Sequence, residues 1–228
     1  MSYLTENLKT VEAKVRSACE KAERQRNDVL LIAVSKTKPI ALLTEAYQCG
    51  IRDFGENRVQ ELVQKAESLP ADIHWHMIGH LQKNKVKPAV RHAYLIHSVD
   101  SYALAKTISD EAVKQAKNVS ILLEVNIAEE ESKFGYSATE VLADISQIAT
   151  LPNIQVKGLM TIAPYTENAE SNRIYFEQLK QLSVDIRNKN IDNVSMDVLS
   201  MGMSGDYEIA IEEGATMIRV GTSIFGER

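Results

Sequence analysis

The sequence predicts a single (β/α)8 TIM barrel, and three observations favour this α/β fold class. Short apolar runs alternate with longer helical patterns along the chain, the apolar runs are almost uninterrupted, and eight of them can be counted. Uninterrupted apolar runs are typical of strands buried on both faces of a parallel sheet, and eight strand–helix units favour closure into a barrel. Strand counting alone leaves an open doubly wound sheet as the alternative.

The first predicted strand illustrates how each strand is recognised. The segment 29–35, VLLIAVS, begins with six consecutive apolar residues and is bounded by Asp28 and Pro39. Its length and composition predict a strand that is buried on both faces. The remaining strands are recognised in the same way, as short apolar runs between polar residues, glycine or proline. The eight predicted strands are 29–35, 53–55, 73–79, 94–99, 120–127, 155–161, 196–200 and 217–220.

Helical patterns precede the first strand and separate the later ones. Gly50 and Gly214 follow two of these patterns and Pro70 follows a third, as expected at helix ends. The predicted helices are 4–26, 40–48, 58–68, 101–117, 138–150, 169–188 and 206–213. The helix at 4–26 is an addition to the eight strand–helix units. Because no linker, low-complexity stretch or charge block interrupts the chain, residues 1–228 are predicted to form one domain.

Composition narrows the classes of function. Hydrophobic residues make up 44% of the chain and charged residues 25%, which is typical of a globular protein. With 26 basic against 31 acidic residues and no basic stripe, we expect no nucleic-acid partner. No apolar stretch approaches the roughly 20 residues that span a membrane, and the charged amino-terminal segment lacks the apolar core of a secretion signal. Cys19 and Cys49 form no CxxC pair, so we expect reduced cysteines and a cytoplasmic location.

Polar and small residues gather where the predicted strands end. In a barrel, functional residues cluster at the carboxyl ends of the strands and in the loops that follow them. Lys36 follows the first predicted strand directly, and a lysine at this place is either a solvated residue or a reactive amine at the mouth of a pocket. The other residues at such positions are Glu56, Asn57, Gly79, His80, Asp100, Asn126, Thr161, Pro164, 200–204 and 221–223.

The last two of these loops predict a phosphate site. The segment SMGMSGD contains Ser204 and then begins a predicted helix, and RVGTSIFG places Gly221 and Thr222 directly after the last strand. Small residues let main-chain N–H groups approach an anion closely, and barrels often bind phosphate between these two loops. Either loop alone is also compatible with ordinary turn formation.

Arg219 and the histidines leave alternatives open. Arg219 lies inside a predicted strand, so its side chain points either into the barrel mouth or outward to a surface carboxylate. His74 and His76 share a face of a strand, but no third ligand stands at a metal-site spacing, so we interpret them as structural residues. His80 remains a weak candidate for the site. We interpret Glu56 as a helix-surface or capping residue.

The chain resembles the pyridoxal phosphate homeostasis protein family over nearly its whole length. The segments AVSKTKP, FGENRVQE, WHMIGHLQKNK, SVDS, GLMTI, LSMGMSGDYEIAIEEG and RVGTSIFG match that family in order. The resemblance implies a fold-type III barrel similar to the N-terminal half of alanine racemase. It also implies that Lys36 holds pyridoxal 5′-phosphate as an internal aldimine, while Arg219 faces the pyridine nitrogen.

The same resemblance implies the other contacts of the cofactor. Ser204, Gly221 and Thr222 would bind its phosphate, and Asn57 and Met201 would line its ring. A permanently charged arginine beside the pyridine nitrogen disfavours protonation of that nitrogen and weakens the ring as an electron sink.

Three functions are compatible with these features. The first is a monomeric cofactor carrier without turnover of its own, which exchanges pyridoxal phosphate with apo-enzymes. The second is a racemase-like enzyme, but racemisation needs an acid or base on each face of the ring, and the sequence reveals only Lys36. The third is a class I aldolase, whose lysine usually lies on a later strand. We expect the carrier.

Overall fold

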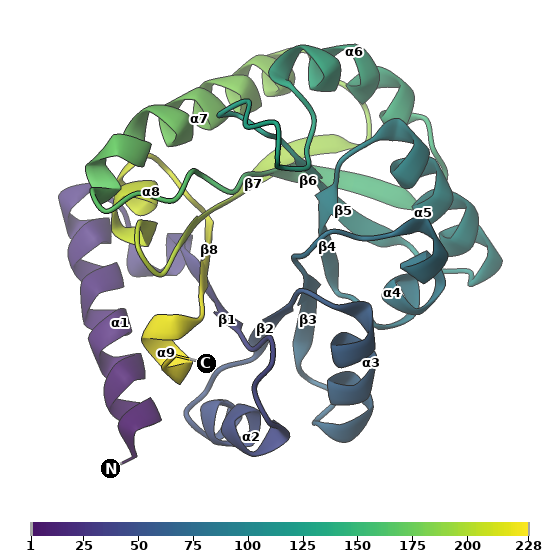
Figure 1. Ribbon diagram of the computed structural model, residues 1–228. Coiled ribbons are helices and arrows are strands. Elements are labelled where there is room, and N and C mark those ends of the chain that lie inside the picture. Colours follow the sequence, from purple (N-terminus) through teal and green to yellow (C-terminus); the bar gives the residue numbers. More distant parts are fainter. Residues whose placement is uncertain (1, 228) are drawn as a thin grey trace.

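The computed structural model describes residues 2–227, in which eight parallel strands form a closed barrel (Figure 1). Neighbouring strands pair in sequence order, and β8 pairs with β1 to close the ring. The predicted (β/α)8 barrel is therefore confirmed. The strands are β1 (Leu30–Val34), β2 (Asp53–Glu56), β3 (His74–Met77), β4 (Leu95–Val99), β5 (Val119–Glu124), β6 (Ile154–Met160), β7 (Val194–Met203) and β8 (Met217–Val220).

Helices surround the barrel on its outer side (Figure 1). Within residues 2–227, no helix is both long enough and apolar enough to span a membrane. The α-helices are α1 (Tyr3–Lys21), α2 (Ile40–Gln48), α3 (Val59–Ser68), α4 (Val86–His92), α5 (Tyr102–Lys114), α6 (Ala138–Ala149), α7 (Arg173–Asn188), α8 (Tyr207–Glu212) and α9 (Thr222–Phe225). Three 3-10 turns accompany them, η1 (Arg26–Asp28), η2 (Lys83–Lys85) and η3 (Ala169–Asn172).

Side chains alternate along each strand, and this alternation separates two layers of packing. Ile121 and Leu123 belong to the large core between strands and helices, whereas Leu122 packs with Leu95 and Met160 in a small cluster inside the barrel. Gly158 lets β6 and β7 come close, because a Cβ at that position would lie 1.8 Å from the carbonyl oxygen of Val198. The small cluster of Leu95, Leu122 and Met160 therefore forms part of the packing inside the barrel.

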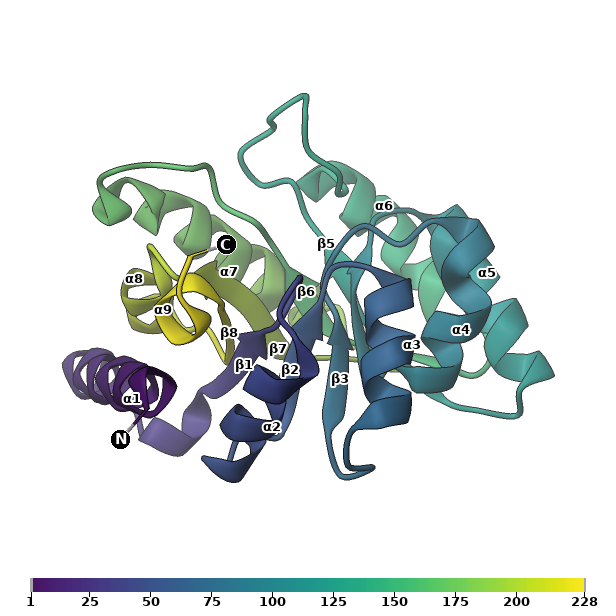
Figure 2. The same cartoon turned by 60° about the horizontal axis from the view of Figure 1, so that its bottom comes forward.

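The additional amino-terminal helix, α1, packs against the last units of the barrel. The Ser2 side chain caps it by accepting a hydrogen bond from the Thr5 N–H, and its buried face includes Val11 and Val15. Figures 1 and 2 show α1 beside α8 and α9, and the Asn7 side chain donates a 3.0 Å hydrogen bond to the Ile224 carbonyl. The predicted helix at 4–26 is confirmed, although it ends five residues earlier.

Two helices and one strand extension were not expected from the sequence. The predicted set lacks α4 and α9, because α4 has seven residues, with Pro88 among them, and α9 has only four. Segments this short hold too few turns for a helical period to be recognised. β7 extends to Met203, three residues beyond the predicted end, through a register shift between Ser200 and Met203. That extension shapes the site.

Candidate functional site

A cavity of about 350 Å³ lies at the carboxyl ends of the strands, the end at which barrels carry their functional residues. The structure brings together side chains that follow β1, β2, β7 and β8 and are far apart in sequence. Six of the seven residues predicted for the site line this cavity, namely Lys36, Asn57, Ser204, Arg219, Gly221 and Thr222. Its remaining lining residues are Val34, Ile78, Ile162, Met203 and Gly205.

Met201 is the predicted site residue that the structure places elsewhere. Ser200 points into the barrel, where its Oγ accepts a hydrogen bond from Arg219, so strand alternation directs Met201 outward. Met201 is fully buried in the core between strands and helices. Gly202, with a φ of +89°, then interrupts the regular alternation, and Met203 reaches the cavity. The methionine side chain that lines the cavity is therefore that of Met203, in place of Met201.

Lys36 is held in place by the two residues that flank it. The Ser35 N–H donates to the Gly55 carbonyl at 3.0 Å, which extends the pairing of β1 with β2. Thr37 adopts a φ of +63°, and its N–H donates a 2.7 Å hydrogen bond to Oε2 of Glu61. Because a non-glycine residue at positive φ is unfavourable, the Glu61 carboxylate helps to hold this turn. The main chain on both sides of Lys36 is thus fixed.

A buried ion pair lies directly behind this turn. Lys65 donates to Oε1 of Glu56 at 2.7 Å and to the Ser35 carbonyl at 2.8 Å, and the Ser35 hydroxyl donates to the same Glu56 oxygen at 2.6 Å. Burial raises the pKa of Glu56, and the hydrogen bonds from Lys65 and Ser35 oppose that rise. Glu56 is fully buried, so the interpretation as a helix-surface or capping residue is wrong.

Sequence reasoning missed the partner of Glu56. Lys65 lies on α3 four residues after Glu61, and this spacing looks like an ordinary exposed helix pair. The available signal was the position of Lys65 on the apolar face of α3, in phase with Leu62. A lysine on such a face needs a buried carboxylate, and Glu56 at the end of β2 provides it.

The loops after β7 and β8 meet at the cavity and form an anion cradle. The Gly221 N–H donates a 3.2 Å hydrogen bond to Oγ of Ser204, which ties the two loops together. The main-chain N–H groups of Ser204, Gly205 and Thr222 make no hydrogen bond to any residue within 2–227. At Gly205 a Cβ would meet nothing within 4 Å, so the cradle is open on that side. Unpartnered N–H groups and hydroxyls of this kind suit a phosphate.

Asp206 braces the cradle from behind. Its Oδ1 accepts a 2.6 Å hydrogen bond from the Met203 N–H, and its Oδ2 accepts a 2.8 Å bond from the Asn172 side chain. Asn172 in turn donates to the Pro164 carbonyl at 3.1 Å. The carboxylate therefore fixes the SMGMSGD loop without occupying the cavity. Asp206 was expected to begin a helix, and its bracing role has no local sequence signal.

Arg219 points into the barrel mouth, which settles the alternative left open by the sequence. It is 4% exposed, and its guanidinium donates to Oγ of Ser200 at 2.6 Å and to the Thr161 carbonyl at 2.7 Å. Burial lowers the pKa of Arg219 to about 10, and the negative charges of Asp206 and Glu124 oppose that shift. The guanidinium is therefore charged at neutral pH.

A hydrogen-bonded chain runs from Arg219 through the barrel to the opposite end. From Ser200 Oγ it continues to Nδ1 of His97 at 2.9 Å, from His97 Nε2 to Nδ1 of His76 at 2.9 Å, and from His76 Nε2 to Oδ1 of Asp53 at 3.0 Å. Asp53 begins β2, so it lies at the amino ends of the strands. We call these five residues the interior relay.

All the hydrogen bonds of the interior relay are donated in the same direction along the chain of residues. Burial lowers the pKa of His76, and it lowers that of His97 well below the ordinary value, so both rings are neutral. A carboxylate accepts but cannot donate, so the proton of His76 is on Nε2 and its Nδ1 accepts from His97. The proton of His97 is then also on Nε2, and its Nδ1 accepts from the Ser200 hydroxyl. Every bond therefore donates away from Arg219 toward Asp53.

These contacts also account for the predicted structural histidines. His74 is bonded to Oδ1 of Asp53 at 3.2 Å, and His76 is satisfied on both nitrogens. Within the part of the chain that the structure describes, no group of three or more His, Cys, Asp or Glu side chains could hold a metal ion. The hydrogen bonds of His74 and His76 agree with their interpretation as structural residues.

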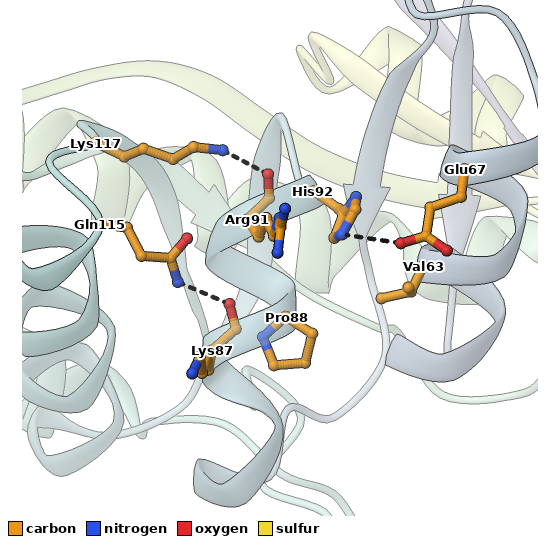
Figure 3. A pocket seen from close by; sticks show the side chains of 8 residues that line it. All are labelled: Val63, Glu67, Lys87, Pro88, Arg91, His92, Gln115 and Lys117. Atoms are coloured by element: carbon orange, nitrogen blue, oxygen red, sulfur yellow. Dashed lines mark hydrogen bonds and ion pairs between the residues drawn. The ribbon is translucent and has the colours of Figure 1, made fainter.

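Another cavity lies on the outer side of the barrel. It has a volume of about 680 Å³ and is lined from α3, α4 and the segment before β5 (Figure 3). Lys117 and the Gln115 side chain donate hydrogen bonds to main-chain carbonyls of α4, and His92 pairs with Glu67 at 3.9 Å. These polar groups connect neighbouring helices, so the cavity is a groove between packed elements.

Comparison with known proteins agrees with the geometry. The family model "Alanine racemase, N-terminal domain" matches residues 7–228. The pyridoxal phosphate homeostasis protein of Aquifex aeolicus is 45% identical over 98% of this chain and 97% of its own length. The protein of the same name from Escherichia coli K12 is 36% identical over 100% of this chain and 98% of its own length.

Solved structures extend this agreement to three dimensions. PipY of Synechococcus elongatus PCC7942, solved with pyridoxal phosphate bound, superposes with a TM-score of 0.85 at 37% identity and covers 98% of this chain and 100% of its own. An alanine racemase of Clostridium difficile 630 has a TM-score of 0.77 at 12% identity, and 57% of that chain is covered, which shows a shared barrel fold alone. The chain belongs to the pyridoxal phosphate homeostasis protein family.

Proposed function

We propose that this protein binds pyridoxal 5′-phosphate and maintains its intracellular supply by storing, buffering or delivering it. One observation carries the proposal: a single cavity is lined by a primary amine, an anion cradle and a buried guanidinium. A phosphorylated pyridine aldehyde has a matching group for each of the three. The names of the relatives and the ligand of PipY support the same function.

Lys36 supplies the amine in this proposal. When bound, the cofactor offers an aldehyde to which a primary amine can be joined covalently. The Ser35–Gly55 and Thr37–Glu61 hydrogen bonds hold the main chain on both sides of Lys36. A fixed main chain limits the positions of the amine and thereby favours one attachment point.

The anion cradle holds the phosphate. Ser204 and Thr222 contribute hydroxyls, and the N–H groups of Ser204, Gly205 and Thr222 are available as donors. Gly221 lies against β1, and a Cβ there would be 3.3 Å from Val34, so the tight approach of the two loops favours glycine. Asn57 and Met203 line the remaining wall beside the ring.

Arg219 would lie beside the pyridine nitrogen of the bound cofactor and would oppose its protonation. A permanent cation beside that nitrogen opposes the addition of a second positive charge, so the ring withdraws electrons weakly. Ser200 and Thr161 fix the orientation of the guanidinium, and the interior relay polarises Ser200 toward His97. This arrangement suits a protein that holds the cofactor without using it to stabilise a carbanion.

The titratable groups of the cavity support a carrier rather than an enzyme. Among the described residues that line it, Lys36 and Arg219 are the ones with titratable side chains. Racemisation needs a second acid or base, and an always charged arginine does not serve as one. We therefore propose that the protein has no turnover of its own and acts in the cytoplasm as a monomer that passes its cofactor to apo-enzymes.

Transfer and turnover assays test this function together. Protein loaded with pyridoxal phosphate and freed of excess cofactor should restore the activity of an apo-enzyme that depends on it. The same protein incubated with L-alanine should give no racemised, decarboxylated or transaminated product above the rate of free cofactor. Stereospecific exchange of the amino acid's α-hydrogen at an enzymatic rate, abolished by Lys36→Ala, would replace the carrier with a catalyst.

A further inference from the structure

A second cavity, of about 200 Å³, adjoins the candidate cofactor site. The two cavities share Asn57, Ile78 and Ile162 as walls. The loop between β5 and α6, which rises above the strand ends in Figure 2, contributes Lys133 and Phe134 to the lining. This second cavity therefore lies between the barrel mouth and the longest projecting loop near it.

A buried carboxyl group lines this cavity. Glu124 is the last residue of β5, two residues after Leu122, which belongs to the cluster inside the barrel. Strand alternation therefore directs both side chains inward. Glu124 is 6% exposed, and its Oε2 makes no hydrogen bond to any residue within 2–227. A buried carboxylate without a partner is strongly unfavourable, so this group needs a proton or a cation.

The basic side chains around this carboxyl group, those of Arg219, Lys133 and His80, are engaged with other groups. Arg219 donates its hydrogen bonds to β6 and β7. Lys133 pairs with Glu130 and donates to a main-chain carbonyl. His80 pairs with Asp100 at 3.2 Å and stacks on a phenylalanine ring. None of these three side chains forms an ion pair with the Glu124 carboxyl group, and Asp100 adds a negative charge nearby.

We propose that this cavity binds a small molecule through a primary ammonium group, which pairs with the Glu124 carboxylate. An ammonium group carries a positive charge and three N–H donors. Oε2 of Glu124, in contrast, accepts no hydrogen bond from any residue within 2–227. Divalent metal ions require several oxygen ligands, and no suitable cluster exists among the described residues. Pockets for drug-sized ligands measure about 300–1,000 Å³, so a cavity of 200 Å³ fits a molecule of amino-acid size.

The proposed site predicts how binding depends on pH. Burial raises the pKa of Glu124 to about 7, the charge of Asp100 adds to that rise, and Arg219 opposes it. An ammonium stabilises the ionised carboxylate, so binding near neutral pH must expel a proton from Glu124. Affinity should therefore increase from pH 6 to pH 8. The other titratable or charged groups around Glu124 are His80 and Lys133, which also line the cavity, together with Asp100 and Arg219.

Titration calorimetry with methylammonium and L-alanine tests the proposal. Measurements in two buffers of different ionisation enthalpy at pH 7 should reveal proton release on binding. Binding should be weakened at least about tenfold by Glu124→Gln and remain unchanged in Glu131→Gln, which removes the same charge from an exposed position of the same loop. Repeating the titration in Lys36→Ala protein from which the cofactor has been removed excludes reaction of either amine with the cofactor aldehyde, so this test is independent of the proposed function.

Carbon NMR of the Glu124 carboxyl group provides a measurement that needs no variant. Its pKa in wild-type protein should fall when either amine is present at saturating concentration. Binding of equal strength in Glu124→Gln, binding without proton release, or an unchanged carboxyl pKa at high amine concentration would overturn the proposal. The last result would mean that water or a proton alone satisfies the group.

Discussion

The two halves of the barrel mouth differ in how their buried charges are satisfied. On the side of β1, β2, β7 and β8, each buried charge has close partners, as Arg219 has in Ser200 and Lys65 has in Glu56. At the end of β5, Glu124 is equally buried but forms no ion pair with any residue within 2–227. Oε2 lacks a hydrogen bond in Glu56 and in Glu124 alike, so the difference lies in the cation that Glu56 has and Glu124 lacks. A buried charge with a counter-ion or close donors and acceptors fixes a geometry, whereas a buried charge without a counter-ion destabilises the fold until a proton or a ligand satisfies it. The charges beside β1, β2, β7 and β8 therefore fix the geometry of the cofactor site, whereas Glu124 is available to pair with a ligand.

Neutralising a buried charge should therefore change the free energy of unfolding in opposite directions in the two halves. Removing one member of a bonded pair leaves the other buried and uncompensated. Removing an unpartnered charge relieves the protein of an unfavourable group. Stability measurements can therefore separate the two halves without any ligand.

The largest effect is expected from Lys65→Met. The substitution keeps most of the side-chain volume but leaves the Glu56 carboxylate without its cation, which should lower the free energy of unfolding by about 3–5 kcal/mol. Urea unfolding at pH 7 measures this change. Lys114→Met provides the control, because its side chain is 71% exposed and its pairing with Glu111 spans 3.8 Å. A loss of similar size in both variants would remove the distinction between buried and exposed pairs.

A smaller effect of opposite sign is expected from Glu124→Gln. The pKa of Glu124 is raised to about 7 in the folded protein, against an ordinary value of 4.5, so the native state resists ionisation between these values. Stability is therefore lost as pH rises from about 4.5 to about 7. At pH 8 the glutamine variant should be more stable than wild type by roughly 2 kcal/mol, and the advantage should shrink toward pH 5.

Thermal unfolding across this pH range checks the sign of the Glu124 effect. A glutamine variant less stable than wild type at pH 8 would mean that the carboxylate is well satisfied in the folded protein. The two halves of the mouth would then be alike, and the second cavity would lose its principal argument.

The smallest effect concerns the interior relay and is spectroscopic. Nitrogen NMR at pH 7 should find both His76 and His97 as neutral rings protonated on Nε2, because burial lowers both pKa values. In Asp53→Ala the acceptor at the end of the relay is lost, so the tautomer of His76 should become mixed. A His97 ring protonated on Nδ1 in wild-type protein would contradict the single direction of the relay.

The fold and most of the site were accessible from the sequence, because both follow local rules. Uninterrupted apolar strands predicted the barrel, and the place of Lys36, Ser204 and Gly221 after their strands predicted that they would meet. The sequence left the direction of Arg219 open, since a strand of four residues has too few neighbours to establish which face is inside.

The remaining features depend on contacts between distant segments. Met203 replaces Met201 at the cavity because Gly202 breaks the alternation, and the sequence pattern gives no position for such a break. The Glu56–Lys65 pair joins β2 to α3, and the interior relay joins five strands, β2, β3, β4, β7 and β8. Glu124 looks like the polar end of an ordinary strand until the barrel closes around it. Such contacts follow from closure of the barrel and leave no periodic signal.

Attachment of the cofactor to Lys36 is the central claim, and borohydride reduction followed by peptide mass mapping tests it most directly. Protein loaded with pyridoxal phosphate, reduced and digested should carry the added mass on the peptide that contains Lys36. Lys36→Ala should lose the visible absorption of the bound cofactor, and Lys114→Ala should keep it, because that lysine is exposed on α5. A wild-type protein that stays colourless with added cofactor, or label found on another lysine alone, would contradict the claim.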